Sequence, residues 1–272
     1  MGEVVRVRKE KTSGTLIKFT PKKTVKLRKD GQPKETPCNT KHNRDNVYPF
    51  KEEDVPRMVD ALKDKIESSK NSDDRMTFRR YLALFIMGIN IGLRASDLLA
   101  LKWCQVYDKD WNFLDGIKIK PIKTERTNKH VFLKYNDSFR KAIEEYRQYY
   151  NPTNLNAYIF ESREKDSKKS KKNSKGKETK KEWIEVQTAG KYIKNVAKSI
   201  GIKYNVNSHS MRKTFARTIY DHSPDKEAAL IGIGIIFGHS SLKITRDYLC
   251  ITEEEIDRLY NMVNLGYEII EE

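Results

Sequence analysis

Apolar residues at helical spacing dominate the chain from about residue 47 onward and limit what it can fold into. In the first such run Val55, Met58 and Leu62 recur at intervals of three and four residues, after an acidic stretch at residues 51–54. A helix with this pattern has one apolar side, which must be buried against other elements. The sequence therefore predicts a packed, mainly helical domain that starts near residue 49.

The helical pattern is interrupted by strands within residues 113–133. There Ile117 and Ile119, then Val131 and Leu133, alternate as in strands around a polar turn. The expected fold class is therefore mainly α with a small antiparallel β-sheet (α+β). Helices are expected at about residues 51–66, 76–90, 96–102, 137–150, 186–200, 209–221, 225–237, 242–250 and 252–264.

Two segments lack the apolar residues that a core needs. Residues 1–46 are rich in Lys and Arg and poor in large apolar side chains, so we expect a flexible basic N-terminal arm. Residues 161–182 are rich in Lys and Ser, and we interpret them as an inserted loop that is disordered or follows DNA. Residues 47–272 are predicted to form one domain around this insertion.

The charge of the chain points to a polyanionic partner. Its formal net charge is +16 and its isoelectric point is near 9.5. A protein that neutralises backbone phosphates releases condensed counterions and so gains affinity for nucleic acid. Nucleic acid is the first candidate, although an anionic membrane surface or solubility alone would also explain positive charge.

Cysteine usage and hydropathy indicate an intracellular protein. Cys38, Cys104 and Cys250 are odd in number and lack the spacing of metal ligands, so neither a disulfide framework nor a zinc site is expected. The N-terminus is charged where a secretory signal would be apolar, and no apolar run is long enough to span a bilayer. We expect a soluble cytoplasmic protein without a membrane partner.

Six residues spread over the chain carry the groups needed to transfer a phosphodiester to a tyrosine. Arginine matches two non-bridging phosphate oxygens, so Arg94 and Arg212 can bind one phosphate from two directions. A phenol has an ordinary pKa of about 10 and needs nearby cations and a proton acceptor, for which His209 is placed. No metal ion or cofactor is required. The candidates are Arg94, His209, Arg212, His239 and Tyr248, together with a lysine.

Three motifs in this order resemble those of the tyrosine recombinase (phage integrase) family. Residues 91–99 read Ile-Gly-Leu-Arg-Ala-Ser-Asp-Leu-Leu, with an acidic residue three positions after the arginine. His209 and Arg212 frame a motif similar to the family's second, and Gly238-His239 followed by Tyr248 is similar to its third. The resemblance covers roughly residues 47–262 and implies the catalytic-domain fold of that family.

The predicted strand pair supplies the remaining position of the family's catalytic set. The turn at residues 123–129 resembles the family's β-hairpin, which carries a catalytic lysine. Lys123 matches that position best, and Lys129 is the alternative.

The resemblance implies a site-specific DNA recombinase or integrase that uses neither metal nor ATP. Tyr248 attacks a DNA phosphate, forming a 3′-phosphotyrosyl link and releasing a 5′-hydroxyl that Lys123 helps to protonate. The two arginines and two histidines hold the transition state. Asp97 is assigned to orientation and helix packing, because a carboxylate would repel the phosphate. Lys213 and Arg217 are expected to face flanking phosphates or solvent.

The resemblance also implies double-stranded DNA as the partner. Family members act as homo-oligomers assembled on DNA, with a tetrameric synapse, so the same is expected of this chain. The helix expected at residues 252–264 is the candidate contact between protomers.

One departure from the family keeps other functions open. No helical core-binding domain is recognisable in residues 1–46, which places the chain nearer to catalytic-domain-only recombinases such as fimbrial switch invertases. A type IB topoisomerase uses similar groups, and a non-catalytic DNA-binding relative is a further alternative. The spacing of His239 and Tyr248 favours the recombinase over the topoisomerase.

Overall fold

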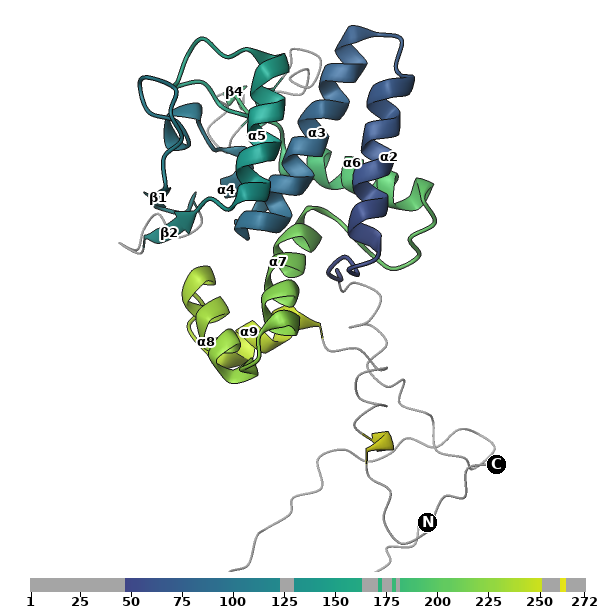
Figure 1. The fold of residues 1–272 in the computed structure, drawn as a ribbon, viewed down its shortest axis with the longest axis vertical. Coiled ribbons are helices and arrows are strands. Elements are labelled where there is room, and N and C mark those ends of the chain that lie inside the picture. Colours follow the sequence, from purple (N-terminus) through teal and green to yellow (C-terminus); the bar gives the residue numbers. More distant parts are fainter. Residues whose placement is uncertain are drawn as a thin grey trace, which may run out of the picture. The chain divides into compact units, whose positions relative to one another are not determined.

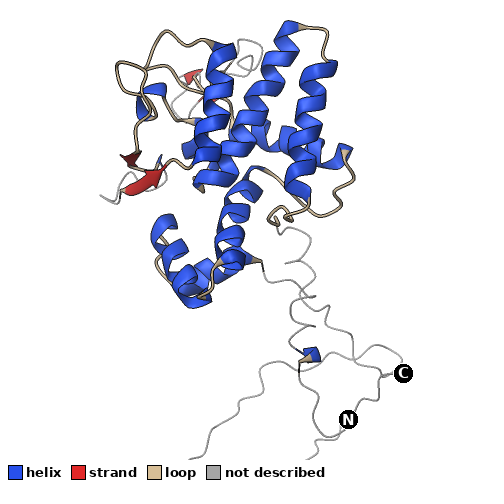
Figure 2. Ribbon diagram, in the orientation of Figure 1, coloured by secondary structure: helices blue, strands red, loops and turns tan. Residues whose placement is uncertain are grey.

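The computed structural model describes residues 47–122, 130–162, 171–172, 178–179, 182–250 and 260–262. The predicted arm at residues 1–46 lies outside these residues, as do Lys123 and Lys129. Most of the inserted loop and most of the expected helix at residues 252–264 also lie outside them. Where the structure is described it is mainly helical with short antiparallel strands, as Figures 1 and 2 show, so the predicted fold class is confirmed.

Three helices stand side by side and form the centre of the main core (Figure 1). They are α2 (Asp54–Ser68), α3 (Ser72–Ile91) and α5 (Asp137–Tyr150), with α3 in contact with both others. Helix α3 starts where the Asn71 side chain accepts a hydrogen bond from the Asp73 amide, which satisfies a donor of its first turn. Helix α6 (Val186–Ser199) packs against α2 and α3.

A two-stranded sheet lies beside this bundle. Strands β1 (Gly116–Ile119) and β2 (Val131–Lys134) are antiparallel, as predicted, and Ile119 lies opposite Val131. In β2 the side chain of Leu133 is buried whereas that of Phe132 is exposed, because neighbouring side chains of a strand point to opposite faces.

Backbone hydrogen bonds join the two ends of the insertion at its base. The amide of Ser162 donates to the Glu182 carbonyl at 2.9 Å, and the amide of Ile184 donates to the Phe160 carbonyl at 3.0 Å. Within the insertion, the described residues are the paired strands β3 (Lys171–Lys172) and β4 (Glu178–Thr179). The base therefore fixes where the lysine-rich segment begins and ends.

Three further helices gather below the bundle in Figure 1 and enclose a second, smaller core. They are α7 (Ser208–His222), α8 (Lys226–Phe237) and α9 (Leu242–Leu249). Met211 of α7 belongs to the main core, whereas Ala216, one and a half turns later, belongs to the second. Helix α7 thus connects the two cores and fixes one relative to the other.

A glycine turn joins α3 to α4 (Ala95–Leu99), which precedes the short 3₁₀ helix η1 (Trp103–Gln105). Gly92 has a φ of 65°, a left-handed conformation that other residues adopt only with strain. A β-carbon there would also lie 2.4 Å from Cδ1 of Phe215 on α7. Glycine therefore lets the chain turn tightly against α7 two residues before Arg94.

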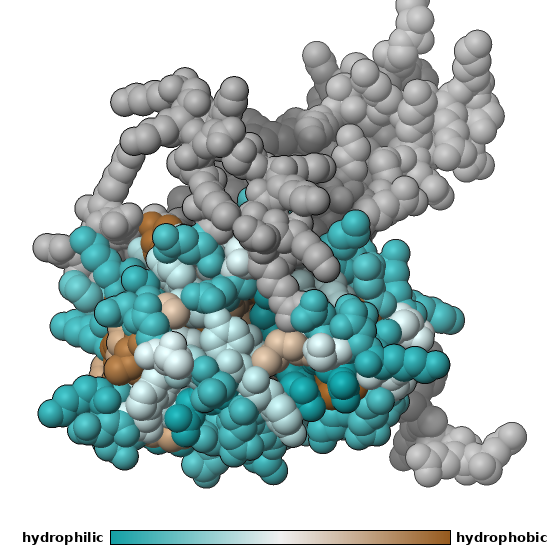
Figure 3. Space-filling view, turned by 90° about the horizontal axis from the view of Figure 1, so that it is seen from above, coloured by the Kyte–Doolittle hydropathy of each residue, from teal (hydrophilic) through white to brown (hydrophobic). Residues whose placement is uncertain are grey.

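The face seen in Figure 3 is largely hydrophilic, with apolar atoms in small separate groups. Among the described residues no single helix is long and apolar enough to cross a membrane, whereas α8 and α9 reach that length and composition together, as a pair bent by 100°.

Candidate active site

Five of the six predicted residues meet where α7, α8 and α9 approach the turn after α3. The sixth, Lys123, lies outside the described residues. The residues that come together are Arg94, His209, Arg212, His239 and Tyr248.

Tyr248 lies on α9 with its half-buried ring among three others. Its ring centroid is 5.0 Å from that of His239, 5.5 Å from that of Phe237 and 6.4 Å from that of His209. The Arg212 guanidinium carbon is 5.8 Å from the same ring centroid. The phenol therefore has two imidazoles and a fixed cation as neighbours.

Arg212 is the most constrained residue of the site, with 3% of its surface exposed. One guanidinium nitrogen donates to the Gly92 carbonyl and another to the Phe237 carbonyl at 3.3 Å. Its guanidinium carbon lies 3.6 Å from the Phe237 ring centroid, so the ring packs against the cation. Burial lowers the pKa of Arg212 to about 10, against the opposing effect of Tyr248, and the group stays charged at neutral pH. Its Nε is buried without a hydrogen-bond partner among the described residues.

Arg94 occupies the N-cap position of α4, with an extended backbone. Its carbonyl accepts hydrogen bonds from the amides of Asp97 and Leu98, both at 2.9 Å, which sets the start of the helix. The side chain is half-buried, and its charge contributes to lowering the pKa values of both Arg212 and His239. The two guanidinium groups are thus close enough to affect each other's charge, but only that of Arg212 is buried.

Asp97 links α4 to the segment that follows β1. Its carboxylate, with 5% of the residue exposed, accepts a hydrogen bond from the Ile122 amide at 3.0 Å. Burial raises the pKa of Asp97, while the Ile122 amide, Arg94 and Arg212 act in the opposite direction. The residue next to Lys123 is therefore held against α4, in keeping with the orienting role predicted for Asp97.

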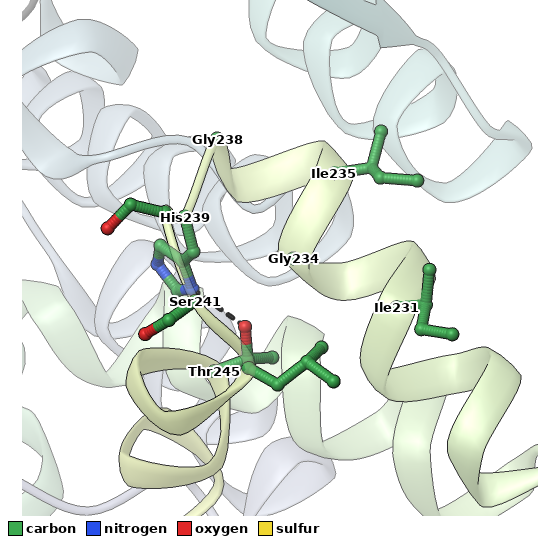
Figure 4. Close-up of a pocket in the computed structure, with 9 residues that line it drawn as sticks. Ile231, Gly234, Ile235, Gly238, His239, Ser241 and Thr245 are labelled. Atoms are coloured by element: carbon green, nitrogen blue, oxygen red, sulfur yellow. Dashed lines mark hydrogen bonds between the residues drawn. The ribbon is translucent and has the colours of Figure 1, made fainter.

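His239 follows Gly238, which ends α8 with a left-handed φ of 65°. The His239 amide donates to the Gly234 carbonyl at 2.9 Å, and Nδ1 lies 3.0 Å from Oγ1 of the buried Thr245. Figure 4 shows this contact bridging the turn to α9. When the Thr245 hydroxyl donates to Nδ1, the ring proton resides on Nε2, where it can be given to a phosphate oxygen.

Burial, together with the charges of Arg212 and Arg94, lowers the pKa of His239 to about 4. An unfolded histidine titrates near 6.5, so the unfolded chain binds the extra proton first as the pH falls, and acid favours unfolding between about pH 6.5 and 4. We expect wild type to lose on the order of 2 kcal/mol more stability over this range than His239→Gln. Urea unfolding of both proteins at several pH values checks this. A loss of equal size in both would contradict it.

Two residues of the site have no counterpart among the sequence candidates. Phe237 supplies the ring and the carbonyl that hold Arg212, and Thr245 orients His239. Thr245 lies three residues before Tyr248, a spacing that places both on one face of α9. The spacing from Tyr248 is the sequence signal that could have identified Thr245. The residue that Thr245 contacts, His239, lies on another element, so the contact itself leaves no local pattern in the sequence.

The arrangement is suited to binding and activating an anion. Two arginines supply positive charge, a neutral histidine supplies a hydrogen bond, and a phenol stands beside them. Within the described ranges, no three His, Cys, Asp or Glu side chains gather as a metal ion would need. The arginines and the histidine can stabilise negative charge, and the phenol can supply a nucleophilic oxygen.

Known proteins share both the sequence pattern and the fold. The phage integrase family model matches residues 49–255. The probable integrase/recombinase YoeC of Bacillus subtilis (strain 168) is 28% identical over 184 residues, which cover 68% of this chain and 84% of YoeC. XerA recombinase has a similar fold, with a TM-score of 0.54 and 20% identity over 82% of this chain.

A second similar fold is that of the XerH site-specific recombinase in its post-cleavage complex with a palindromic difH substrate. Its TM-score is 0.52, with 17% identity over 80% of this chain. This chain spans 65% of the XerA structure and 54% of the XerH structure. Because the family model matches most of its length, the chain belongs to the tyrosine recombinase (phage integrase) family.

Proposed function

We propose that this chain cleaves and rejoins DNA strands at a specific site through a 3′-phosphotyrosyl intermediate on Tyr248. The observation that carries the proposal is the position of the phenol between two imidazole rings and the Arg212 guanidinium. A tyrosine whose role is packing alone has no need of this polar surrounding. The family membership supports the same reaction.

The proposed cleavage step transfers one phosphoryl group. The Tyr248 oxygen attacks phosphorus and gives its proton to a base, the role assigned to His209, while the bond from phosphorus to the 5′ oxygen breaks. The 5′ oxygen takes a proton from Lys123. Arg94 and Arg212 bind the non-bridging oxygens, and neutral His239 donates to one of them. Reversal with a 5′-hydroxyl from another strand completes an exchange without ATP.

The site supplies the required charge from its own side chains. Arg212 is held by two carbonyls and a ring before any substrate arrives, so no reorganisation is needed as charge develops on the phosphate. We therefore propose that the reaction uses neither a metal ion nor a cofactor.

Double-stranded DNA is the proposed substrate, and the cytoplasm the proposed compartment. The net charge of +16 favours a polyanion, and the XerH structure with a similar fold is a complex with its difH substrate. Cleavage within a specific site also distinguishes this activity from relaxation by a topoisomerase, which leaves no recombinant product.

The decisive experiment uses a duplex with a nick close to the cleavage site, from which the short 5′-hydroxyl fragment diffuses away. Protein bound to labelled DNA should survive denaturing gel electrophoresis, in EDTA as well as in buffer. Mass spectrometry of the digested adduct should place the nucleotide on Tyr248. Binding without any adduct would favour a non-catalytic relative, and relaxation of supercoiled DNA without recombinant product would favour a topoisomerase.

We also propose that protomers assemble on DNA, as a tetramer in the complete synapse. Helix α8 exposes Ile231 and Ile235, at 47% and 75%, along a hollow of about 320 Å³ between α8 and α9. In Figure 4 both side chains lie on one side of α8, away from His239. Such a surface suits burial by another protomer, and residues 252–264 are the proposed contributing segment.

Replacing Ile235 with Asp tests the assembly. A charge at this position should prevent burial of α8, so the variant should still form the covalent adduct but yield fewer multimeric complexes on DNA. Native gels and light scattering with two-site DNA measure this. Tyr149→Asp on α5, where the tyrosine is also more than half exposed, is the control. Equal loss of assembly in both variants would contradict the assignment to α8.

A further inference from the structure

One face of α7 carries three basic residues that lie beside α9. His209, Lys213 and Arg217 recur every four residues, so they lie on one helix face. His209 faces the Tyr248 ring, and the Lys213 ammonium lies 5.7 Å from the centroid of that ring. Arg217 reaches the Leu249 carbonyl at 3.5 Å. Lys213 and Arg217, which were expected to face flanking phosphates or solvent, thus make contacts within the protein at the end of α9.

Lys213 makes two specific contacts. Its Nζ donates to the Val47 carbonyl at 2.7 Å and lies 3.1 Å from the Cys250 sulfur. An ammonium group has three donors, and two of them are used here. Cys250 follows directly after α9, two residues beyond Tyr248. The half-buried lysine thus links the end of the nucleophile's helix to the beginning of the described domain.

The segment at residues 47–51 is a fixed point for this link. The amide of Tyr48 donates to the Asn205 carbonyl at 2.9 Å, and the amide of Phe50 donates to the Thr214 hydroxyl at 2.8 Å. The Phe50 ring is buried edge-on against Phe85, with ring centroids 5.2 Å apart. A contact to Val47 is therefore a contact to the main core.

Helix α9 needs such support. It has eight residues, which is shorter than a helix that is stable by itself. It ends at Cys250, whose φ of 51° is left-handed, a conformation that costs a residue with a β-carbon roughly 1 kcal/mol. Positive charge near the last carbonyls of a helix stabilises it. The lysine and Arg217 supply that charge at the end of α9.

We propose that Lys213 is a positioning residue, which fastens the end of α9 to residues 47–51 and so holds the Tyr248 phenol beside Arg212. The inference rests on the proposed function of Tyr248. It differs from two other roles for a lysine near a phosphate. A general acid would protonate the 5′ leaving group, and a phosphate contact would contribute to DNA affinity, whereas the positioning residue acts through the place of the phenol.

The test is the rate of adduct formation by Lys213→Met at saturating DNA in a single turnover. A displaced nucleophile should slow this step by roughly 10- to 100-fold while DNA affinity stays within about twofold. Lys213→Arg keeps a donor and should recover part of the rate. Lys63→Met, which removes an exposed charge from α2, is the matched control and should react as wild type.

Modified DNA separates positioning from proton donation. Sulfur in place of the bridging 5′ oxygen creates a leaving group that needs no proton, so it restores the rate of a variant that lacks a general acid. Lys213→Met should stay slow on this DNA. Restoration of its rate, a loss confined to DNA affinity, or an unchanged rate would each overturn the proposal.

A second readout does not depend on catalysis. Loss of the Lys213 contact should expose the Cys250 thiol, so iodoacetamide should modify it several-fold faster in folded Lys213→Met, as quantified on the Cys250 peptide by mass spectrometry. Cys250→Ala removes the other partner and serves if Lys213→Met unfolds; it should also slow adduct formation. Absence of any adduct in wild type would refute the function of Tyr248, whereas unchanged thiol reactivity would refute the link itself.

Discussion

Tyr248→Phe will leave the protein folded and bound to DNA but unable to form a covalent adduct. We expect adduct formation to fall by at least about four orders of magnitude, because no water molecule or other side chain can replace the nucleophile in the recovered product. The ring of the variant can keep its packing against Phe237, whose centroid lies 5.5 Å away. Denaturing gels with nicked duplex measure the adduct, and thermal unfolding measures the fold.

Tyr220→Phe is the matched control for this substitution. Tyr220 lies on α7, packs against the same small core as Tyr248 and has the Lys226 ammonium 5.2 Å from its ring centroid. Its hydroxyl has no part in the proposed reaction, so the control should form adduct at the wild-type rate. An adduct formed by Tyr248→Phe, or loss of adduct in both variants, would contradict the assignment of the nucleophile.

The helices were largely predictable because their ends carry local signals. Helix α5 runs from Asp137 to Tyr150 as predicted, since Asn136 caps its first turn and Asn151 ends it in a left-handed conformation. Helix α3 starts at Ser72, four residues before the predicted start. Its first turn is acidic and carries no apolar residue to extend the pattern, although Asn71 was a capping signal that marked the true start.

The sequence identified five residues that the structure brings together at the candidate site, but not how their side chains are held. The spacing of His209 and Arg212 correctly places both on one side of α7, yet the histidine is exposed and the arginine almost fully buried. The spacing of two residues in a helix sets the angle between their side chains around the helix axis. The burial of each side chain depends on which other elements pack against it. Here Phe237 comes from α8 and covers Arg212, so the difference is a property of the tertiary structure.

The contacts of Thr245 and Lys213 depend on the same packing. Helices α8 and α9 are bent by 100° relative to each other, which returns α9 to α7 and brings Thr245 to His239. No local pattern in the sequence encodes that angle. The catalytic role of Lys123 stays a prediction, and the Ile122 amide held by Asp97 is the nearest described anchor for it.

Arg94→Lys and Arg212→Lys should both slow catalysis but should differ in their effect on stability. Either substitution removes the planar fork of donors, so each should slow adduct formation by about 10²- to 10³-fold. Arg212→Lys also leaves the Gly92 and Phe237 carbonyls with fewer donors in a buried site, and should lower the free energy of unfolding by roughly 2 to 4 kcal/mol.

Arg94→Lys should be nearly neutral for stability. The Arg94 side chain is half-buried, and α4 begins through its backbone carbonyl, which the substitution keeps. We expect a change of less than about 1 kcal/mol in urea unfolding, with the same loss of catalysis as in Arg212→Lys. If both variants were equally destabilised, the kinetic losses would reflect folding rather than phosphate binding. If only Arg212→Lys is destabilised while both variants lose the same rate, the two arginines act on one phosphate. Arg212 then also stabilises the fold, whereas Arg94 does not.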